Sequence, residues 1–202
     1  MASTETPGDI FAIVLAAGTA SRFGATKQLA EFDGVPLVRR AMETANAVCP
    51  TRTVLVVGHE WRAVTACCGP VPGFIVYSED YTAGIGNSLA SAVKAIRHAA
   101  NAVVVLLADQ VLITAEHVQA LCSTWSGADD EIVATAYAGA AGAPVLFPRG
   151  CFDGLMALSG DNGGRHLLSD DRYRVRTIAC EAAAIDVDTP ADLTPTSRSA
   201  RN

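Results

Sequence analysis

The sequence predicts an α/β protein in which one mostly parallel sheet lies between two layers of helices. Two observations support this fold class. First, short apolar runs rich in Val and Ile alternate with amphipathic helical patterns along the chain, and this alternation is typical of parallel sheets with crossover helices. Second, 50% of the 202 residues are hydrophobic, only 18% are charged and 6% are aromatic. A chain of this length and composition can bury one core, so we expect a single domain spanning 1–202.

The expected strands are continuous apolar runs bounded by glycine or turn residues. They are Ile10–Ala16, Thr53–Val57, 73–77, Ala102–Leu107, 131–136, 144–147, 175–178 and 184–187. The most hydrophobic run, Ala102–Leu107, is expected near the centre of the sheet. A glycine-rich turn at 139–142 precedes the run 144–147. This turn favours one antiparallel strand in the otherwise parallel sheet.

Apolar residues at helical spacing predict the helices between these strands. They are a helix beginning near Pro36, helices at 60–68, 152–158 and 165–168, a helix capped by Asn87 or Ser88, and a helix capped by Thr114. Thr189 followed by Pro190 predicts a final short helical turn. We expect residues 9–193 to form the ordered core and the polar segment 194–202 to be a flexible tail.

Charge and composition exclude several classes of function. The formal net charge is −6, which argues against nucleic acid or an anionic membrane as the main partner. No run of 18 apolar residues is present and the first nine residues are polar, so we expect a cytoplasmic protein. The six cysteines form no C-x-x-C pair and are expected to be buried as small hydrophobic residues.

The loop after the first strand predicts a phosphate site. It reads L-A-A-G-T-A-S-R-F-G-A-T-K from Leu15 to Lys27. Small residues let backbone N–H groups approach an anion, Ser21 offers a hydroxyl, and Arg22 and Lys27 offer positive charge. The loop is not a P-loop, because five residues separate Gly18 from the next glycine and no lysine follows it, and it lacks the dinucleotide fingerprint G-x-G-x-x-G. The alternative is an ordinary strand-to-helix turn with two surface cations.

Aspartates near two strand ends predict a metal site. Asp109 follows the central apolar run, at the edge where ligands of open α/β sheets lie. Asp186 and Asp188 stand two residues apart at the end of the expected strand 184–187, and in an extended chain both would point to the same face. Carboxylates together with substrate phosphates are the ligands of a hard cation, so a metal or nucleotide contact is expected. Asp109 could instead cap a turn, and Asp188 could cap the short helix that Pro190 opens.

At this point the motifs resemble a known family. The segment 15–29, L-A-A-G-x-x-x-R-F-G-x-x-K-Q-L, resembles the opening motif of the MobA-like nucleotidyltransferases. The form with Ala17 and R-F-G at 22–24 looks most like the molybdenum cofactor cytidylyltransferases. The resemblance continues at G-N-S-L (86–89), A-D-Q (108–110), G-A-P-V-L-F-P (142–148), G-D-N-G-G-R (160–165) and D-V-D-T-P-A-D-L (186–193). One departure is Val111, because the family usually has proline after the Asp-Gln pair.

The resemblance implies a Rossmann-like fold of the nucleotide-diphospho-sugar transferase type, and it implies an activity. The enzyme would transfer a nucleoside monophosphate, CMP from CTP, to a molybdopterin-type acceptor with Mg²⁺ as cofactor, and a molybdoenzyme could receive the product. Arg22, Lys27 and Asp109 would be catalytic, and Asp109 and Asp188 would hold Mg²⁺ from opposite sides. The residues implied to bind nucleotide or acceptor are Leu15, Ala16, Ala17, Gly18, Ser21, Arg22, Lys27, Gly86, Asn87, Ser88 and Arg165.

Three other interpretations stay open at the level of sequence. The first is a nucleotidyltransferase acting on another acceptor, such as a sugar phosphate. The second is a carrier that binds the pterin cofactor without consuming triphosphate. The third is an NAD-dependent oxidoreductase, which the absence of the glycine fingerprint disfavours.

Overall fold

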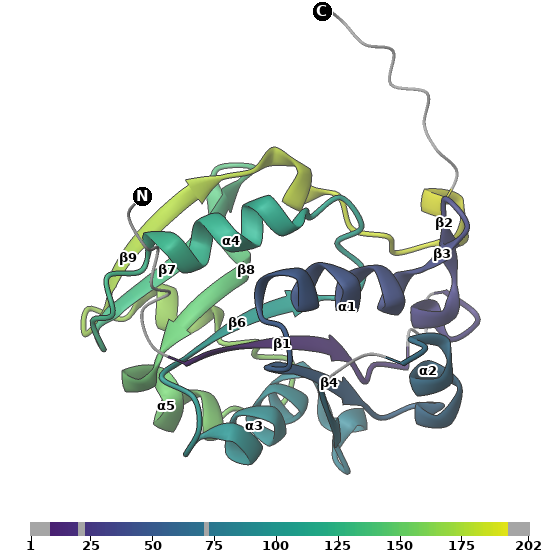
Figure 1. The fold of residues 1–202 in the computed structure, drawn as a ribbon, viewed down its shortest axis with the longest axis horizontal. Coiled ribbons are helices and arrows are strands. Elements are labelled where there is room, and N and C mark those ends of the chain that lie inside the picture. Colours follow the sequence, from purple (N-terminus) through teal and green to yellow (C-terminus); the bar gives the residue numbers. More distant parts are fainter. Residues whose placement is uncertain (1–8, 20–22, 71–72, 194–202) are drawn as a thin grey trace, which may run out of the picture.

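The computed structural model describes residues 9–19, 23–70 and 73–193 and shows a central sheet between two helical layers (Figure 1). In the described part of the chain, seven strands form this sheet in the order β5-β4-β1-β6-β8-β7-β9. Their bounds are β1 Ile10–Ala16, β4 Thr53–Val57, β5 Phe74–Tyr77, β6 Ala102–Leu107, β7 Glu131–Tyr137, β8 Ala140–Pro148 and β9 Arg174–Ala179. The strand β6 lies in the middle of this order, as expected from its hydrophobicity, and its neighbour β1 is buried along its whole length.

One strand of the described sheet, β8, runs against the other six. It pairs antiparallel with β6, as in Val104 opposite Leu146, and antiparallel with β7 on its other side. The remaining pairs are parallel. The predicted mostly parallel sheet with an antiparallel strand is therefore confirmed. The turn before that strand is shorter than expected, because β7 ends at Tyr137 and residues 140–142 already belong to β8.

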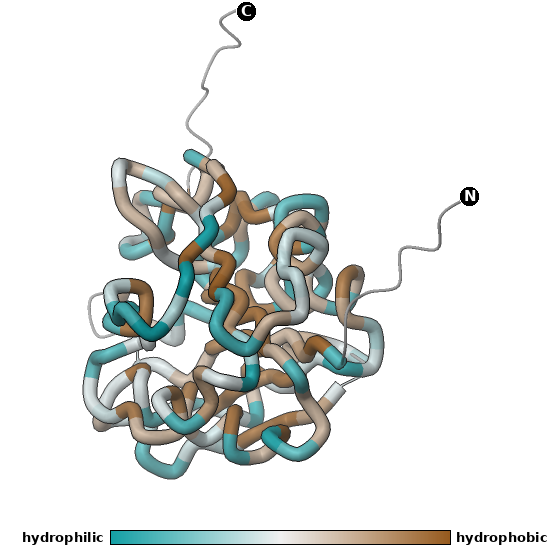
Figure 2. Tube along the Cα trace, turned by 90° about the vertical axis from the view of Figure 1, so that its left-hand side faces the viewer, coloured by the Kyte–Doolittle hydropathy of each residue, from teal (hydrophilic) through white to brown (hydrophobic). Residues whose placement is uncertain are grey.

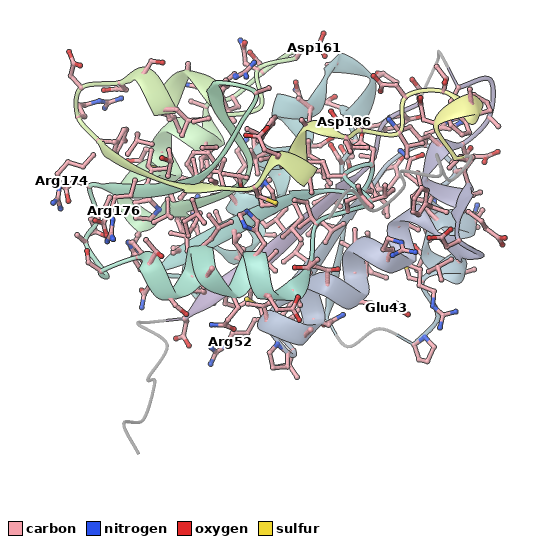
Figure 3. The ribbon with its side chains drawn as sticks, turned by 90° about the horizontal axis from the view of Figure 1, so that it is seen from above. Glu43, Arg52, Asp161, Arg174, Arg176 and Asp186 are labelled. Atoms are coloured by element: carbon pink, nitrogen blue, oxygen red, sulfur yellow. The ribbon has the colours of Figure 1, made fainter. Side chains whose placement is uncertain are left out.

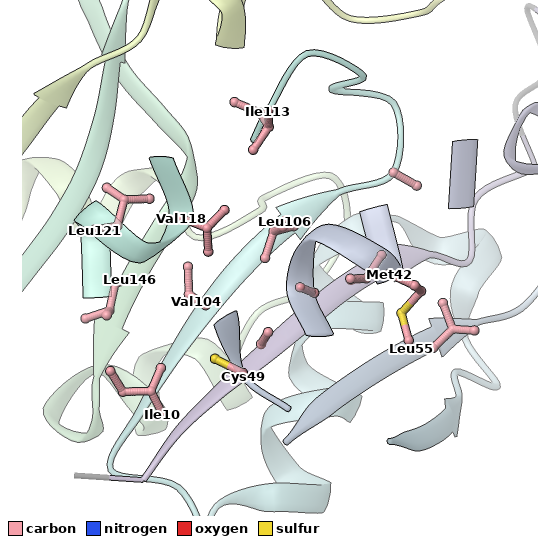
Figure 4. Packing of buried hydrophobic residues seen from close by; sticks show 14 of the residues in the cluster. Ile10, Met42, Cys49, Leu55, Val104, Leu106, Ile113, Val118, Leu121 and Leu146 are labelled. Carbon is pink, nitrogen blue, oxygen red and sulfur yellow. The ribbon is translucent and has the colours of Figure 1, made fainter. Parts of the chain in front are cut away.

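Five α-helices of the described residues cover the two faces of the sheet. They are α1 Leu37–Val48, α2 Trp61–Cys67, α3 Ile85–Ile96, α4 Ala115–Thr124 and α5 Phe152–Met156. Alternate residues of β1 divide the core: Ile10, Ala12 and Val14 pack with side chains of α1, α2 and α4, whereas Phe11 and Ile13 pack with those of α3 and α5. Figure 4 shows the first of these clusters, with residues of β6 between α4 and α1. Hydrophobic segments accordingly run through the middle of the molecule (Figure 2).

Most predicted elements are present, and the differences have local causes. Thr114 caps α4 as expected, its hydroxyl accepting the backbone N–H of His117. The prediction that Asn87 or Ser88 caps the next helix was wrong, because α3 already begins at Ile85, after Gly84. The predicted strand at 184–187 was also wrong: this stretch begins at the end of the 3₁₀ turn η5, Glu181–Ala184, and pairs with no strand among the described residues.

Short elements complete the chain. A two-stranded hairpin, β2 Glu31–Phe32 and β3 Val35–Pro36, precedes α1. The other 3₁₀ turns are η1 Lys27–Leu29, η2 Tyr81–Ala83, η3 Arg149–Cys151, η4 Arg165–Ser169 and η6 Pro190–Leu193. The six cysteines are free thiols, and four of them are buried as expected. None of the helices in the described residues is long and apolar enough to cross a lipid bilayer.

Candidate active site

A cavity of about 340 Å³ lies at the carboxyl ends of β1 and β6. Of the residues that the sequence singled out, Leu15, Ala17, Gly18, Lys27, Ser88 and Asp109 line it. Ala16 does not, because its side chain is buried in the core cluster beneath α1. Ser21 and Arg22 lie outside the described residues. The cavity has the size of a small-molecule site and the position that ligands take in open α/β sheets.

The loop after β1 is held from two sides. The amide of Gln28 donates a hydrogen bond to the carbonyl of Gly18 at 2.9 Å, and the backbone N–H of His59 donates to the carbonyl of Ala17 at 3.2 Å. A Cβ atom at Gly18 would meet only the amide nitrogen of Gln28, at 3.8 Å. Protein packing therefore leaves room for a side chain at Gly18. A glycine there keeps the backbone open to a ligand in the cavity.

Lys27 connects this loop to the two predicted metal ligands. Its Nζ lies 2.8 Å from Oδ2 of Asp109 and 3.1 Å from Oδ1 of Asp188. The Lys27 side chain is 12% exposed, compared with 30% for Asp109 and 51% for Asp188. The structure thus brings together three residues that stand far apart in the sequence. The expectation did not include the contact between Lys27 and the two aspartates, whose carboxylates lie on either side of the ammonium group.

Backbone and side-chain bonds at the end of β6 hold Asp188 near Asp109. The N–H of Val187 donates to the carbonyl of Asp109 at 3.1 Å. The amide of Gln110 donates to the carbonyls of Ala143 and Ala183, at 3.1 and 2.9 Å. The segment carrying Asp186 and Asp188 therefore lies across the end of β6 although it is not a strand. Figure 3 shows Asp186 on this segment.

The alternative capping role of Asp188 is taken by another residue. The carboxylate of Asp192 accepts the backbone N–H groups of Asp188 and Thr189 at 3.1 and 2.7 Å, and the hydroxyl of Thr189 at 2.9 Å. Asp192 therefore fixes the turn that leads into η6. The side chain of Asp188 is free of this capping role and contacts Lys27 instead.

The pKa values of Lys27 and Asp186 are shifted by the charged side chains around them. Burial lowers the pKa of Lys27, but the hydrogen bonds and charges of Asp109 and Asp188 outweigh it, so the pKa is raised and the ammonium form persists. Burial, reinforced by the charges of Asp109 and Asp188, raises the pKa of Asp186 to about 6. Three carboxyl groups at one strand end thus create a strongly negative site that one lysine only partly balances.

The carboxylate oxygens at this site suit a hard divalent cation whose remaining ligands are oxygens of a bound substrate. Oδ1 of Asp109 is buried and has no hydrogen-bond partner among the described residues, so this oxygen is free to take a cation. Asp188 supplies a second, half-exposed carboxylate. Among the described residues no group of three or more His, Cys, Asp and Glu gathers around one metal position. Mg²⁺ commonly binds through one or two carboxylates plus substrate phosphates and water.

The segment at the start of α3 packs against a second loop. The side-chain oxygen of Asn87 accepts the backbone N–H of Gly160 at 2.9 Å, and the N–H of Gly86 donates to the carbonyl of Gly160 at 2.9 Å. A Cβ atom at Gly84 would lie 2.2 Å from the backbone of Gly160. Gly86 and Asn87, which the resemblance assigned to ligand binding, therefore fix the loop at Gly160. That loop brings Asp161 to the wall of the cavity.

Arg165 lies apart from the first cavity. It lines a neighbouring cavity of about 180 Å³, together with Tyr137 and apolar residues of β6 and β8. The two cavities share Leu15, Ile85 and Leu107 in their walls. One opens beside the Gly18 loop and the other beside Arg165, so the pair provides room for two ligands side by side.

Sequence reasoning missed several residues of the site. Gln28 holds the Gly18 loop, Gln110 holds the segment of Asp188, and Tyr137 lines the second cavity. Gln28 and Gln110 stand inside the motifs that carried the resemblance, which was the signal available for them. Tyr137 is in none of these motifs and lies in the site because the β7–β8 hairpin places it there.

Val111 is hydrogen-bonded to Asp109 and packed against side chains near the end of β6. Its backbone N–H donates to the carbonyl of Asp109 at 3.0 Å, a bond that proline could not make. Its side chain is buried with Phe23, Leu37 and Val187 in a small apolar cluster. The residue that departs from the family pattern therefore helps to fix both the end of β6 and the segment that carries Asp188.

These features define the class of the protein. A three-layer α/β fold whose glycine loop, basic residue and paired carboxylates meet at the carboxyl ends of parallel strands is typical of a nucleotide-binding protein. Comparison with known proteins makes this specific. The family model of the MobA-like NTP transferase domain matches residues 12–177, and the chain belongs to this family of nucleotidyltransferases.

Similar proteins agree with this assignment. The purine catabolism protein PucB of Bacillus subtilis (strain 168) is 27% identical over 194 residues, covering 91% of this chain and 93% of PucB. The crystal structure of the Rv0371c homologue from Mycobacterium sp. strain JC1 is 30% identical with a TM-score of 0.78, covering 91% of this chain and 92% of that one. Rv0371c of Mycobacterium tuberculosis H37Rv in complex with manganese is 28% identical with a TM-score of 0.76, covering 91% and 95% of the two chains.

Proposed function

We propose that this protein is a divalent-metal-dependent cytidylyltransferase that transfers CMP from CTP to a phosphate-bearing acceptor of the molybdopterin type. The observation that carries the proposal is the meeting of Lys27, Asp109 and Asp188 beside a cavity of about 340 Å³. The preference for CTP and for a pterin acceptor rests on the motif with Ala17 and R-F-G at 22–24. The product would pass to a molybdoenzyme in the cytoplasm.

The reaction needs positioning and charge neutralisation more than a protein nucleophile. An oxygen of the acceptor phosphate attacks the α-phosphorus of CTP, the bond between the α-phosphorus and its bridging oxygen to the β-phosphorus breaks, and pyrophosphate leaves with the electron pair. Lys27 neutralises the leaving pyrophosphate, and Arg22 of the same loop, although outside the described residues, is proposed to do so as well. The open backbone at Gly18 lets the nucleotide approach.

Asp109 and Asp188 are the residues that would hold the metal ion. A divalent cation would supply charge neutralisation for the triphosphate and polarise its oxygens. We propose Mg²⁺ as the physiological ion. Support for a divalent ion comes from the unpartnered Oδ1 of Asp109 and from the similar Rv0371c structure that contains manganese.

The neighbouring cavity is proposed to take the acceptor. Its apolar wall suits a flat ring system, and Arg165 suits an anionic group such as a phosphate. The shared wall at Leu15 and Leu107 would place such a ligand next to the nucleotide. Asn87 contributes by holding the loop at Gly160, which lines the first cavity with Asp161 and the second with Gly163.

Thermal unfolding with each nucleotide tests this proposal. The protein is unfolded with Mg²⁺ and CTP, GTP, ATP or UTP in turn. A ligand at 100 times its Kd stabilises the folded state by about 2.7 kcal/mol, which corresponds to a rise in Tm of roughly 5–10 °C for a domain of this size. We expect this rise with CTP and its loss in Asp109→Asn. An equal rise with GTP would refute the cytidylyl specificity, and no rise with any triphosphate would refute the enzyme itself.

A further inference from the structure

Lys27 lies where the proposed metal ion has to bind. Its ammonium nitrogen contacts Oδ2 of Asp109 and Oδ1 of Asp188 at 2.8 and 3.1 Å. The side chain is only 12% exposed, so this is a partly buried cation and not a surface ion pair. In this arrangement Lys27 neutralises part of the charge of the two carboxylates.

A metal ion and the ammonium group cannot share these oxygens. Mg²⁺ binds carboxylate oxygens at about 2.0–2.1 Å, so an ion coordinated by Asp109 and Asp188 would come within contact distance of the nitrogen. Two positive charges at that separation in a partly buried site repel strongly. Lys27 leaves one oxygen of each carboxylate unbonded, Oδ1 of Asp109 and the second oxygen of Asp188. A metal ion held by these two oxygens would still lie beside the ammonium group, so the repulsion between them favours a displaced lysine.

The cavity has space into which the ammonium group of Lys27 can move. Lys27 lines the same cavity as Gly18 and Thr19, the loop proposed to receive the phosphates. A lysine carries its charge on a flexible four-carbon stem, so the ammonium group can move while the backbone of η1 stays in place. A bound triphosphate would offer oxygens to the ammonium group in exchange for the two carboxylates.

On the basis of the proposed function, we infer that Lys27 is an internal cation that competes with the metal ion for Asp109 and Asp188 until a triphosphate draws it away. Metal alone then binds weakly, because it has to displace the ammonium group without a new partner for it. With a triphosphate present, the ammonium group moves to the phosphates and both carboxylates become available. The lysine thereby makes metal binding conditional on nucleotide binding, and linkage requires the reverse dependence to be equally large.

The chain provides a matched control for this inference. It contains only two lysines, Lys27 and Lys94. Lys94 lies on α3 and is exposed. Replacing either by methionine removes one positive charge and keeps the length of the side chain. A difference between Lys27→Met and Lys94→Met therefore reports the position of the charge and not the net charge of the protein.

Mn²⁺ binding without nucleotide, followed by electron paramagnetic resonance of the free ion, is the first test. We expect Lys27→Met to bind Mn²⁺ at least about tenfold more tightly than the wild type, and Lys94→Met to match the wild type. We also expect CTP to raise Mn²⁺ affinity much more in the wild type than in Lys27→Met. Equal or weaker Mn²⁺ binding by Lys27→Met would overturn the inference while leaving the proposed function standing. Failure of the wild type to bind Mn²⁺ even with CTP would refute the proposed function, and the inference with it.

A second measurement needs no variant at the site. In protein labelled with ¹³C at the lysine ε-carbon, the two lysines give two signals, which Lys94→Met assigns. We expect the Lys27 signal to stay in place with low Mg²⁺ alone, and to shift when CTP is added with Mg²⁺. An unchanged Lys27 signal in protein that has bound CTP and Mg²⁺, as shown by its raised Tm, would mean that the lysine keeps its carboxylate partners, and would overturn the inference.

Discussion

The backbone N–H of Val187 donates a hydrogen bond to the carbonyl of Asp109, with 3.1 Å between nitrogen and oxygen. This bond joins the end of β6 to a segment almost 80 residues later in the chain, and it brings Asp188 to the lysine that Asp109 also contacts. The proposed metal site therefore depends on a backbone contact between two loops as well as on two side chains.

Asp109→Asn should reduce turnover by about two orders of magnitude or more, because charge neutralisation by a bound metal is worth several kcal/mol in the transition state. Stability should also fall, because the partly buried Lys27 keeps only one of its two carboxylate partners. Steady-state kinetics and urea unfolding of the same preparation measure both effects. Asp153→Asn, an exposed residue of α5, serves as the control. Full activity in Asp109→Asn would remove this residue from the metal site.

Gln110→Leu should destabilise the protein and weaken metal binding together. The amide of Gln110 donates to the carbonyls of Ala143 and Ala183, and leaving buried acceptors unpaired costs about 1–3 kcal/mol. Loss of the bond to Ala183 also releases the segment that carries Asp188. Urea unfolding and Mn²⁺ titration measure the two effects. Gln119→Leu, at an exposed position on α4, should show neither, and unchanged Mn²⁺ affinity in Gln110→Leu would contradict the positioning role.

Asn87→Ala should raise the KM for the acceptor, because the loop at Gly160 loses an acceptor for its backbone N–H. A hydrogen bond of this kind contributes about 1 kcal/mol, so an increase of several-fold is expected with little change in kcat. Asn87→Asp keeps the side-chain oxygen that accepts this N–H and should restore the wild-type KM. If the aspartate variant is as impaired as the alanine variant, Asn87 has a role other than holding this loop.

Glu131 should make the stability of the protein depend on pH in the acid range. Hydrogen bonding by Ser126, whose backbone N–H donates to the buried carboxylate at 2.7 Å, holds the pKa of Glu131 below its ordinary value of 4.5. Since the pKa is lower in the folded state, the ionised carboxylate stabilises the fold above pH 4.5. This stabilisation is lost as the pH falls through the folded-state pKa.

Urea unfolding at pH 7 and at pH 3.5 tests the role of Glu131. The wild type should lose more stability between these two values than Glu131→Gln, which has no charge to lose. Glu79→Gln, at an exposed position, should lose as much as the wild type. Parallel pH profiles for the wild type and Glu131→Gln would show that Ser126 does not favour the ionised form.

The apolar runs in the sequence predicted most strands correctly, but they did not predict contacts between segments far apart in the chain. The fully buried runs of β1, β4 and β6 were recognisable as strands because buried parallel strands are continuously apolar. The run 184–187 is apolar except for Asp186 but pairs with no strand among the described residues. The backbone N–H groups of Ile185 and Val187 donate instead to the carbonyls of Ala182 and Asp109. Apolar composition alone could not distinguish these two outcomes.

The sequence predicted several residues of the site, but it did not predict which of them contact one another. Lys27, Asp109 and Asp188 were each singled out by sequence, but their mutual distances depend on three loops that meet only in the folded chain. Asn87 was expected to cap a helix or to face a ligand, whereas it holds the backbone of Gly160, 73 residues away in sequence. No local periodicity carries information about such a contact.

Transfer of the nucleotidyl group itself tests the account most directly. The protein is incubated with Mg²⁺, CTP labelled at the α-phosphate and a molybdopterin-type acceptor, and the product and pyrophosphate are measured. We expect a labelled pterin–CMP product and one pyrophosphate for each product molecule, and we expect Asp109→Asn to form neither. Binding of CTP and acceptor without labelled product, or equal product formation by Asp109→Asn, would contradict this expectation.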